Sequence, residues 1–373
     1  MNTARIAATE KTGTAAADSS HSRNPVRIWV DGCYDVMHHG HFNALRQAKA
    51  MGDIIVAGVH SDAELLLHKG PPVMNEQERI AAVAACKWVD EVVPNAPYLT
   101  SLEWMDRYSC DFCVHGDDVS TLADGSDSYK HVKDVGRYRE CKRTKGVSTT
   151  DLVSRMLTMA QDQQQQPTQS DQDHTESSDY HVLATARKIG QFLEGNKEPK
   201  KGDKVVYVDG GFDLFHVGHI EFLRRARAMG DYLVVGVHDD QTVGAIKGDR
   251  HPLLSLHERV LSVLACRYVN DVVIGAPYNV TDQVLDGDYG VDVVVRGATT
   301  ASNDTNGQDP YRIPKQRGIF VQLDQPPHPV TTESIVHRIL VNRNLYEERQ
   351  RRKAAKEAAA ALAHPKEDQC GTM

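Results

Sequence analysis

The sequence lacks any long apolar run. Although 40% of its 373 residues are hydrophobic, no stretch approaches the roughly 20 apolar residues that a membrane-spanning helix requires. The polar residues 1–24 contain no apolar segment of the secretory kind, so we expect them to form a disordered tail. The net charge of −8 gives no support for a nucleic-acid partner. We therefore expect a cytoplasmic protein with no transmembrane segment and at most peripheral membrane association.

Cysteine is also scarce, and the seven cysteines follow no pattern. An odd, scattered set of thiols is typical of a reducing compartment rather than of a disulfide scaffold. Cys110 and Cys113 form a lone C-x-x-C, but a zinc site needs a second pair at a suitable spacing, and none follows. We therefore expect no protein-bound metal site and interpret these two residues as thiols near a core strand.

The sequence does contain an internal repeat. Residues 31–62 and 209–240 align without a gap and are identical at 18 of 32 positions. Further matches, such as Glu78-Arg79 with Glu258-Arg259, keep nearly the same offset. The protein is therefore one domain duplicated.

The segment between the two copies is polar and rich in glutamine, which indicates a linker. Within it, residues 181–193 are mildly amphipathic, and we expect a short helix docked against the second domain. The charged C-terminus should begin as an exposed helix. The expected boundaries are a tail at 1–24, a first domain at 25–160, a linker at 161–201, a second domain at 202–345 and a charged helical tail at 346–373.

Strand-like runs alternate with helical patterns in both copies. The continuous apolar run 54–59, which follows a helical pattern at 40–51, is typical of a strand buried on both faces. Such alternation implies βαβ units. We therefore expect an α/β fold made of two tandem Rossmann-like, doubly wound parallel sheets. Ligands bind such sheets beyond the carboxyl ends of the strands, and the motifs described next lie there.

The motif H-x-G-H follows the first strand of each copy and opens a helix. Two imidazoles three residues apart face the same way, and a helix N-terminus attracts anions. The glycine would let a phosphate approach the backbone closely. The pattern predicts a triphosphate cradle, and its repetition disfavours the alternative of packing histidines. The residues are His38, Gly40 and His41 in the first copy and His216, Gly218 and His219 in the second.

A second motif, Arg-Thr-Lys-Gly-Val-Ser-Thr-Thr, occupies residues 143–150. The Arg143 guanidinium can clamp phosphate oxygens in a bidentate manner. Ser148, Thr149 and Thr150 lie where a helix begins, so their hydroxyl and N–H groups can hold further phosphate oxygens.

A lysine in a proline-containing loop is also repeated. Lys69 precedes Gly70-Pro71-Pro72, and its copy Lys247 precedes Gly248. A single loop lysine is usually a solvated surface charge, but the repetition favours a functional role for both.

Together these motifs resemble those of the cytidylyltransferase family, which activates phosphocholine, phosphoethanolamine and glycerol 3-phosphate. Residues 143–150 resemble the family's signature R-T-x-G-x-S-T-[ST], and the tandem arrangement resembles the members that act on phosphoethanolamine. The resemblance implies transfer of CMP from CTP to phosphoethanolamine, giving CDP-ethanolamine and pyrophosphate in phosphatidylethanolamine biosynthesis. It also implies Mg²⁺ held mainly by the CTP phosphates, and a homodimer stays open.

The resemblance further assigns roles to individual residues. The expected catalytic residues are His38, His41, Lys69 and Arg143. Asp31 would recognise the amino-alcohol head, and Tyr98 would lie near it, although plain packing is an equal alternative for Tyr98. The expected nucleotide-binding residues are Gly32, Cys33, Gly40, His115, Gly116, Asp117, Ser148, Thr149 and Thr150 in the first domain, and Gly210, Gly211, His216, Gly218, His219, Lys247, Arg296, Gly297, Thr331 and Thr332 in the second.

The second copy lacks the arginine-containing signature, and the sequence from His328 to Glu333 stands in its place. We therefore expect the first domain to do the chemistry and the second to bind CTP or CMP. The nearest alternative is a nucleotidyltransferase that uses phosphocholine, another phosphate monoester or ATP. A class I aminoacyl-tRNA synthetase is disfavoured, because nothing in the sequence indicates a tRNA-binding domain. A non-enzymatic nucleotide sensor is disfavoured by the intact first-copy motifs.

Overall fold

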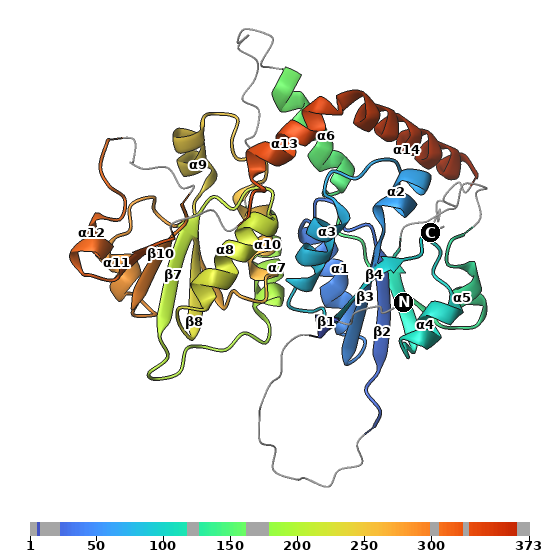
Figure 1. Ribbon diagram of the computed structural model, residues 1–373, viewed down its shortest axis with the longest axis horizontal. Coiled ribbons are helices and arrows are strands. Elements are labelled where there is room, and N and C mark those ends of the chain that lie inside the picture. Colours follow the sequence, from blue (N-terminus) through green and yellow to red (C-terminus); the bar gives the residue numbers. More distant parts are fainter. Residues whose placement is uncertain are drawn as a thin grey trace, which may run out of the picture.

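The computed structural model describes residues 6–7, 23–117, 127–161, 179–298, 306–323 and 328–363. Two α/β halves lie side by side (Figure 1). Each is built around a sheet whose strands are rich in valine and isoleucine, because both faces of the sheet are covered.

The first sheet has the strand order β1-β4-β3-β2-β5-β6, and all pairings except β1 with β4 are parallel. Helices α1 and α3 pack on one face, and α4 and α5 supply buried side chains to the other. The strands are β2 (Arg27–Gly32), β3 (Ile54–His60), β4 (Glu91–Ala96), β5 (Phe112–Gly116) and β6 (Tyr138–Cys141). The helices are α1 (His39–Lys49), α2 (Asp62–His68), α3 (Glu76–Ala84), α4 (Leu102–Arg107), α5 (Lys130–Asp134) and α6 (Thr149–Gln161).

The second sheet repeats this order as β11-β10-β7-β8-β9, with every pairing parallel. The prediction of two tandem doubly wound sheets is therefore confirmed. The strands are β7 (Val205–Gly210), β8 (Tyr232–Val237), β9 (Asp271–Ile274), β10 (Val293–Arg296) and β11 (Phe320–Gln322). The helices are α8 (Val217–Arg227), α9 (Asp240–Lys247), α10 (Leu256–Leu264), α11 (Asp282–Asp286), α12 (Arg312–Gln316) and α13 (Thr332–Val341).

The segments outside the two sheets differ in part from expectation. Within the expected N-terminal tail, β1 (Ile6–Ala7) pairs antiparallel with β4, while residues 1–5 and 8–22 lie outside the described residues. In the expected linker, α7 (Asp179–Leu193) forms the predicted helix and packs against α10. Its Phe192 also meets the Trp88 ring of the first half edge-on, at 5.0 Å between centroids.

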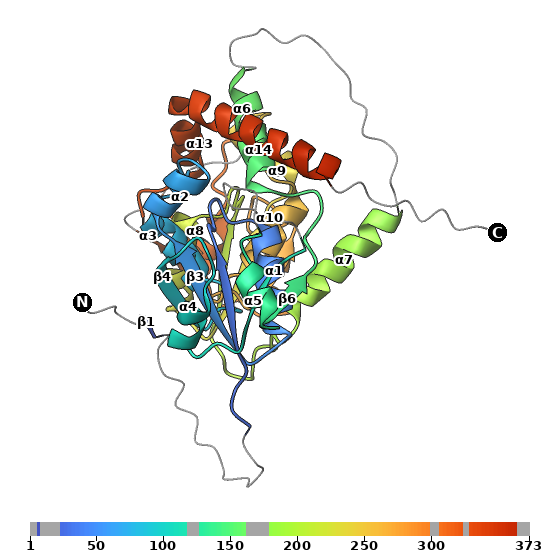
Figure 2. The ribbon, with the colours of Figure 1, turned by 90° about the vertical axis from the view of Figure 1, so that its right-hand side faces the viewer.

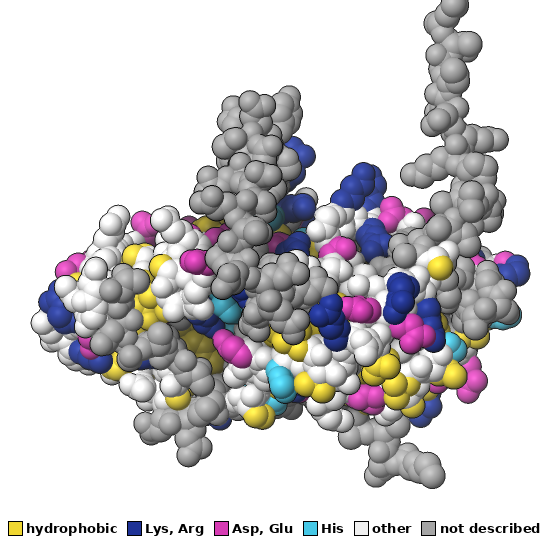
Figure 3. Space-filling model, turned by 90° about the horizontal axis from the view of Figure 1, so that it is seen from above, with side chains coloured by type: hydrophobic (Ala, Val, Ile, Leu, Met, Phe, Trp, Pro, Cys, Tyr) yellow, Lys and Arg dark blue, Asp and Glu magenta, His cyan; other side chains and the backbone are white. Residues whose placement is uncertain are grey.

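Helix α14 (Arg343–Ala363) covers the top of the first half, beside α6 and α13 (Figures 1 and 2). Seen from above, basic and acidic side chains mingle over this region (Figure 3). The expectation of an exposed helix is wrong for its first turns, because the Tyr346 side chain is only 3% exposed. The prediction rested on the charged and alanine-rich composition of the helix, which does not show that one tyrosine is buried.

The two halves meet through the layers formed by α1, α3, α8 and α10, so one hydrophobic cluster spans both of them. Within this cluster the backbones of Cys86 and Cys266, which are equivalent residues of the repeat, form an isolated antiparallel β-bridge, and both side chains are free thiols. Lys87 N donates to Ala265 O at 2.9 Å, and Arg267 N donates to Ala85 O at the same distance. The interface is therefore nearly two-fold symmetric.

Two ion pairs follow the same symmetry. Arg155 of α6 binds Glu258 of α10 at 2.9 Å, and Arg338 of α13 binds Glu78 of α3 at 2.6 Å. Each arginine lies in the helix, α6 or α13, that begins at the end of residues 143–150 or of their counterpart in the second half. It binds the glutamate of a capping box in the other half, so both helices are tied to the opposite half.

Two further expectations concern single segments. Cys110 and Cys113 are buried free thiols in the core of the first half, as predicted. Among the described residues, no helix combines the length and the apolar character needed to cross a bilayer.

Candidate active site

The candidate site lies where strands β2 and β5 are neighbours and their following segments diverge. This is the switch point of a doubly wound sheet, where the loops leave a crevice at the carboxyl ends of the strands. Gly32 ends β2 and leads through Cys33 to the H-x-G-H motif, while His115 and Gly116 end β5.

The H-x-G-H motif forms a capping box made of histidines. His38 Nδ1 accepts from Gly40 N at 3.1 Å, and His41 Nδ1 accepts from His38 N at 3.4 Å. Because Nδ1 is an acceptor in both neutral rings, the proton must reside on Nε2. The two ring centroids are 4.1 Å apart, so the motif presents two adjacent Nε2–H donors.

Burial lowers the pKa of His41 to about 4 and lowers that of His38 well below its usual value. The positive charge of Arg143 contributes to both shifts. At neutral pH the histidines of the free protein are therefore uncharged donors. The second copy behaves alike, since burial lowers the pKa of His216 to about 3 and also lowers that of His219.

The glycine of the motif serves the packing of the protein itself. A Cβ at Gly40 would lie 2.9 Å from the His38 ring and 3.0 Å from Val147, and a Cβ at Gly218 would lie 2.4 Å from the carbonyl oxygen of Val330. Close packing is thus one reason for glycine here, and the expected access for phosphate stays a prediction. The glycine lets the segment before the signature helix lie against the start of α1 or α8.

The signature segment is fixed beside the H-x-G-H motif by hydrogen bonds. Thr149 Oγ1 donates to the carbonyl of Asp35 at 3.0 Å, and Arg143 N donates to Asp117 Oδ1 at 2.8 Å. Ser148 Oγ accepts from Asp151 N at 3.1 Å and so caps α6. The structure thus brings together the predicted residues of the first half, and it gives Ser148, Thr149 and Asp117 positioning contacts.

The Lys69 loop lies against Tyr98. Lys69 follows the end of α2, and its Nζ lies 5.8 Å from the centroid of the Tyr98 ring. The His68 ring also stacks on the Tyr98 ring, with 4.2 Å between the ring centroids. After burial, the charge of Lys69 is the next cause that lowers the pKa of His41. Tyr98 is half-buried between Lys69 and His68, and its role near the acceptor stays a prediction.

Asp31 is a buried carboxylate at the end of β2. Its carboxylate is 7% exposed and accepts from Tyr129 Oη at 3.0 Å, from Trp29 Nε1 at 2.8 Å and from the Thr100 hydroxyl. Burial lowers the pKa of His60, and the charge of Asp31 opposes this effect.

Sequence reasoning missed these four neighbours of Asp31. Trp29 could have been found, because residues two apart on a strand face the same side. His60 belongs to an identical stretch of the repeat. Thr100 and Tyr129 come from distant segments and carry no local signal.

A buried arginine holds the loop that carries Cys33. Arg79 donates to the carbonyls of Cys33 at 2.7 Å and Met74 at 3.2 Å, and to Asp62 at 2.7 Å. The equivalent Arg259 binds the Gly211 carbonyl at 2.6 Å. The repeat identified this Glu-Arg pair, but its role follows only from the contacts.

The predicted residues of the second half also converge. Nine of the ten line one cavity of about 210 Å³, and Arg296, which lies over the Tyr311 ring at 5.2 Å, is the exception. The lining residues are Gly210, Gly211, His216, Gly218, His219, Lys247, Gly297, Thr331 and Thr332.

The second half differs where the first carries its signature. Thr332 Oγ1 binds the Asp213 carbonyl at 2.9 Å as Thr149 binds that of Asp35, so Glu333 takes the place of Thr150. Glu333 Oε1 lies 3.3 Å from Lys247 Nζ. The sequence contains no arginine between 318 and 337, so this half has no counterpart of Arg143.

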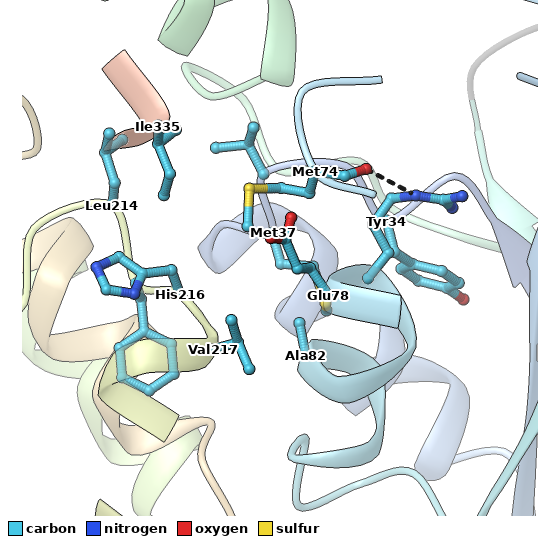
Figure 4. A pocket seen from close by; sticks show the side chains of 12 residues that line it. Tyr34, Met37, Met74, Glu78, Ala82, Leu214, His216, Val217 and Ile335 are labelled. Carbon is cyan, nitrogen blue, oxygen red and sulfur yellow. Dashed lines mark hydrogen bonds between the residues drawn. The ribbon is translucent and has the colours of Figure 1, made fainter. Parts of the chain in front are cut away.

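A second, much smaller cavity of about 10 Å³ lies between the halves (Figure 4). Met74 and Glu78 line it from one side, and His216 and Val217 from the other. This volume suffices for about one water molecule, so the cavity is a packing gap rather than a substrate site.

Comparison with known proteins agrees with this geometry. The cytidylyltransferase-like family model matches residues 29–155 and 207–357. An ethanolamine-phosphate cytidylyltransferase of Dictyostelium discoideum is 51% identical, over 90% of this chain and 96% of its own length. The mouse enzyme of the same name is 47% identical over 94% and 95%.

A mouse choline-phosphate cytidylyltransferase A is 42% identical over only 36% of this chain and 37% of its own. The match over nearly the full length therefore lies with the ethanolamine-phosphate cytidylyltransferases and not with this one. With the same motif at the switch point of both sheets and a family match in each half, the chain belongs to the cytidylyltransferase-like family.

Proposed function

We propose that the chain transfers CMP from CTP to phosphoethanolamine, giving CDP-ethanolamine and pyrophosphate. The observation that carries this proposal is the hydrogen bond from Thr149 to the Asp35 carbonyl, which holds the 143–150 segment against the loop that leads into the H-x-G-H motif. The charge of Arg143 acts on both histidines, and that of Lys69 acts on His41. The relatives that match nearly the whole chain bear the name of this activity.

The reaction needs no protein nucleophile. A phosphate oxygen of phosphoethanolamine attacks the α-phosphorus of CTP in line, and a new P–O bond forms. The bond to the bridging oxygen breaks, and pyrophosphate leaves with that electron pair. Catalysis then consists of positioning and charge stabilisation. The Nε2–H groups of His38 and His41 donate to the α-phosphoryl and departing oxygens, and Lys69 and Arg143 offset the growing negative charge.

Recognition of the acceptor would rest on Asp31 and Tyr98. An ammonium group can bind a carboxylate and the face of an aromatic ring. Asp31 already accepts three hydrogen bonds, which fix the position of its carboxylate. Lys69 lies beside Tyr98, where it would meet the acceptor's phosphate.

Mg²⁺ would accompany CTP. Among the described residues, no group of three histidine, cysteine, aspartate or glutamate side chains could hold a metal ion. The donor set therefore suits an ion held mainly by phosphate oxygens and water. When bound, it would neutralise charge on the terminal phosphates.

We further propose that the first half alone carries the chemistry, supported by the pairing of Lys247 with Glu333 in the second. A cytoplasmic location is supported by the free buried thiols. A homodimer of full chains stays a prediction from the sequence.

The test is CTP-dependent pyrophosphate release by the purified chain. Phosphoethanolamine, phosphocholine and glycerol 3-phosphate are offered separately, and His41→Ala and His219→Ala are assayed beside the wild type. We expect turnover with phosphoethanolamine and its loss in His41→Ala only. Preference for another acceptor would refute the substrate, equal loss in both variants would refute the division of labour, and the absence of pyrophosphate release would leave a nucleotide sensor.

A further inference from the structure

The cavity of the second half differs from the first site in charge. Its lining includes three carboxylates, Asp209, Asp213 and Glu333, and one cationic side chain, Lys247. Glu333 pairs with that lysine at 3.3 Å, and His216 is neutral at pH 7 because burial lowers its pKa to about 3. A triphosphate entering this cavity would meet more negative than positive charge, so its binding is disfavoured.

The wall that faces an amine is preserved in the second half. Asp209 accepts from Tyr311 Oη at 2.5 Å, as Asp31 accepts from Tyr129. His238 Nδ1 lies 3.0 Å from the Ala276 carbonyl, and its ring is 5.5 Å from that of Tyr278. The equivalent pair of the first half, His60 and Tyr98, has ring centroids 5.3 Å apart.

Asp209 lacks partners that Asp31 has. Tyr207 replaces Trp29, and Val280 replaces Thr100, so two of the three donors are lost. Among the described residues, Asp209 Oδ2 has no hydrogen-bond partner although the side chain is buried. Burial raises the pKa of Asp209. Tyr311, His238 and Arg296 offset part of this effect, and a cation bound beside the unpartnered Oδ2 would stabilise the ionised form further.

The size of the cavity limits the ligand. Its volume of about 210 Å³ is below the roughly 300–1,000 Å³ of clefts that bind drug-sized molecules. A single phosphate group could still lie at the N-terminus of α8, against the neutral donors of His216 and His219.

We propose that the second-half cavity binds a small phosphate monoester that carries an ammonium group, and that it does not take a nucleoside triphosphate. The ligand belongs to the class of the acceptor in the proposed reaction, and its identity rests on that proposed function. The cavity would then be a second acceptor site, in which the residues that bind the triphosphate in the first copy of the repeat have been lost. The expectation of a CTP or CMP site in this half is the competing outcome.

The test is equilibrium dialysis of the full chain with labelled phosphoethanolamine and, separately, with labelled CTP. Asp31→Asn removes the amine contact of the first site, so any phosphoethanolamine still bound reports on the second. We expect one phosphoethanolamine per Asp31→Asn chain, and an affinity at least about tenfold lower when Asp209→Asn is added, because a charge-assisted hydrogen bond is lost. We expect one CTP per wild-type chain.

Two results would overturn the proposal: a second CTP per wild-type chain, or phosphoethanolamine binding to Asp31→Asn that is absent or insensitive to Asp209→Asn. Tyr278→Ala on the Asp31→Asn background serves as a second variant, since it leaves the bond between Asp209 and Tyr311 intact and should also weaken binding. An unchanged CTP stoichiometry verifies that each variant is folded. The failure of the proposed function is separate, because it would show as missing turnover in the wild type.

Discussion

Arg349 of helix α14 donates a hydrogen bond to the carbonyl oxygen of Pro71 at 3.1 Å. One turn earlier, Tyr346 Oη donates to the Pro72 carbonyl at 3.2 Å. Helix α14 follows the second half of the chain, whereas this loop begins with Lys69 of the first half. The guanidinium of Arg349 also lies 3.7 Å from Asp35, which accepts from Val73 N and Met74 N at the far end of the loop. The second half therefore fixes the position of the Lys69 loop.

Arg349→Ala should lower kcat/KM for CTP by roughly tenfold, because losing a buried hydrogen bond and a charge near Lys69 removes about 1–2 kcal/mol of positioning. Steady-state kinetics with varied CTP measures this. The matched control is Arg352→Ala, three residues on, whose side chain is 76% exposed and pairs only with Glu348 among the described contacts. Equal kinetics for the two variants would show that α14 does not support the loop.

The symmetric ion pairs of the interface should contribute measurably to stability. Arg338→Met leaves the buried carboxylate of Glu78 without its partner, and we expect a loss of about 1–3 kcal/mol in the free energy of unfolding, less than for a fully buried pair because Arg338 is partly exposed. Thermal denaturation measures the shift. Arg343→Met, which breaks an exposed pair within α14, should change stability by less than about 0.5 kcal/mol. Similar melting temperatures for both would contradict the assignment.

The two motif glycines should differ in their tolerance of alanine. A Cβ at Gly218 meets a backbone carbonyl at 2.4 Å, which cannot move without shifting the chain, whereas a Cβ at Gly40 meets side chains at 2.9–3.0 Å. We expect Gly218→Ala to lose about 1–3 kcal/mol of stability and Gly40→Ala less. Gly40→Ala should instead reduce turnover, since the His38 ring must move. Melting temperatures and pyrophosphate release on the same samples test both statements.

Acid should destabilise the protein through its buried histidines. In the folded state burial lowers the pKa of His41 to about 4 and that of His216 to about 3, against 6.5 for a histidine of the unfolded chain. Below pH 6.5 the unfolded chain therefore binds protons that the folded chain does not bind. The free energy of unfolding keeps its full value above pH 6.5 and decreases as the pH falls toward 4.

The measurement is the free energy of unfolding between pH 7.5 and 5 for the wild type and for His41→Asn, which can still accept the bond from His38 N. The variant should show a shallower pH dependence than the wild type. Parallel curves for the two proteins would indicate that other groups govern acid unfolding.

The duplicated sequence predicted the fold well, because repetition turned weak local patterns into shared ones. The H-x-G-H motif and residues 143–150 similarly predicted the family, since both motifs depend on local geometry at the start of a helix. Thr100, Tyr129 and Arg349 could not be found this way. Each reaches the site through tertiary packing from a distant segment, and nothing in its neighbouring sequence marks its partner.

The local pattern also misled at α14. Its apolar face is mostly alanine, which indicates a weakly packed helix. In the fold, Tyr346 is buried, and its hydroxyl and the Arg349 guanidinium donate to the Pro72 and Pro71 carbonyls of the Lys69 loop. Bonds to backbone carbonyls depend on where another segment ends, and residue type alone does not specify them.

The backbone β-bridge between Cys86 and Cys266, which lies at the interface of the two halves, bears on how the molecule could evolve. In an assembly of two identical chains, every substitution alters both sides of the interface and both sites at once. Here the two halves belong to one polypeptide chain, and Cys86 and Cys266 are free thiols, so dilution cannot separate the halves and each can acquire its own substitutions. Arg143 could be retained on one side while Glu333 arose on the other, and a repeat that no longer performs the reaction could persist as the surface on which its twin is built.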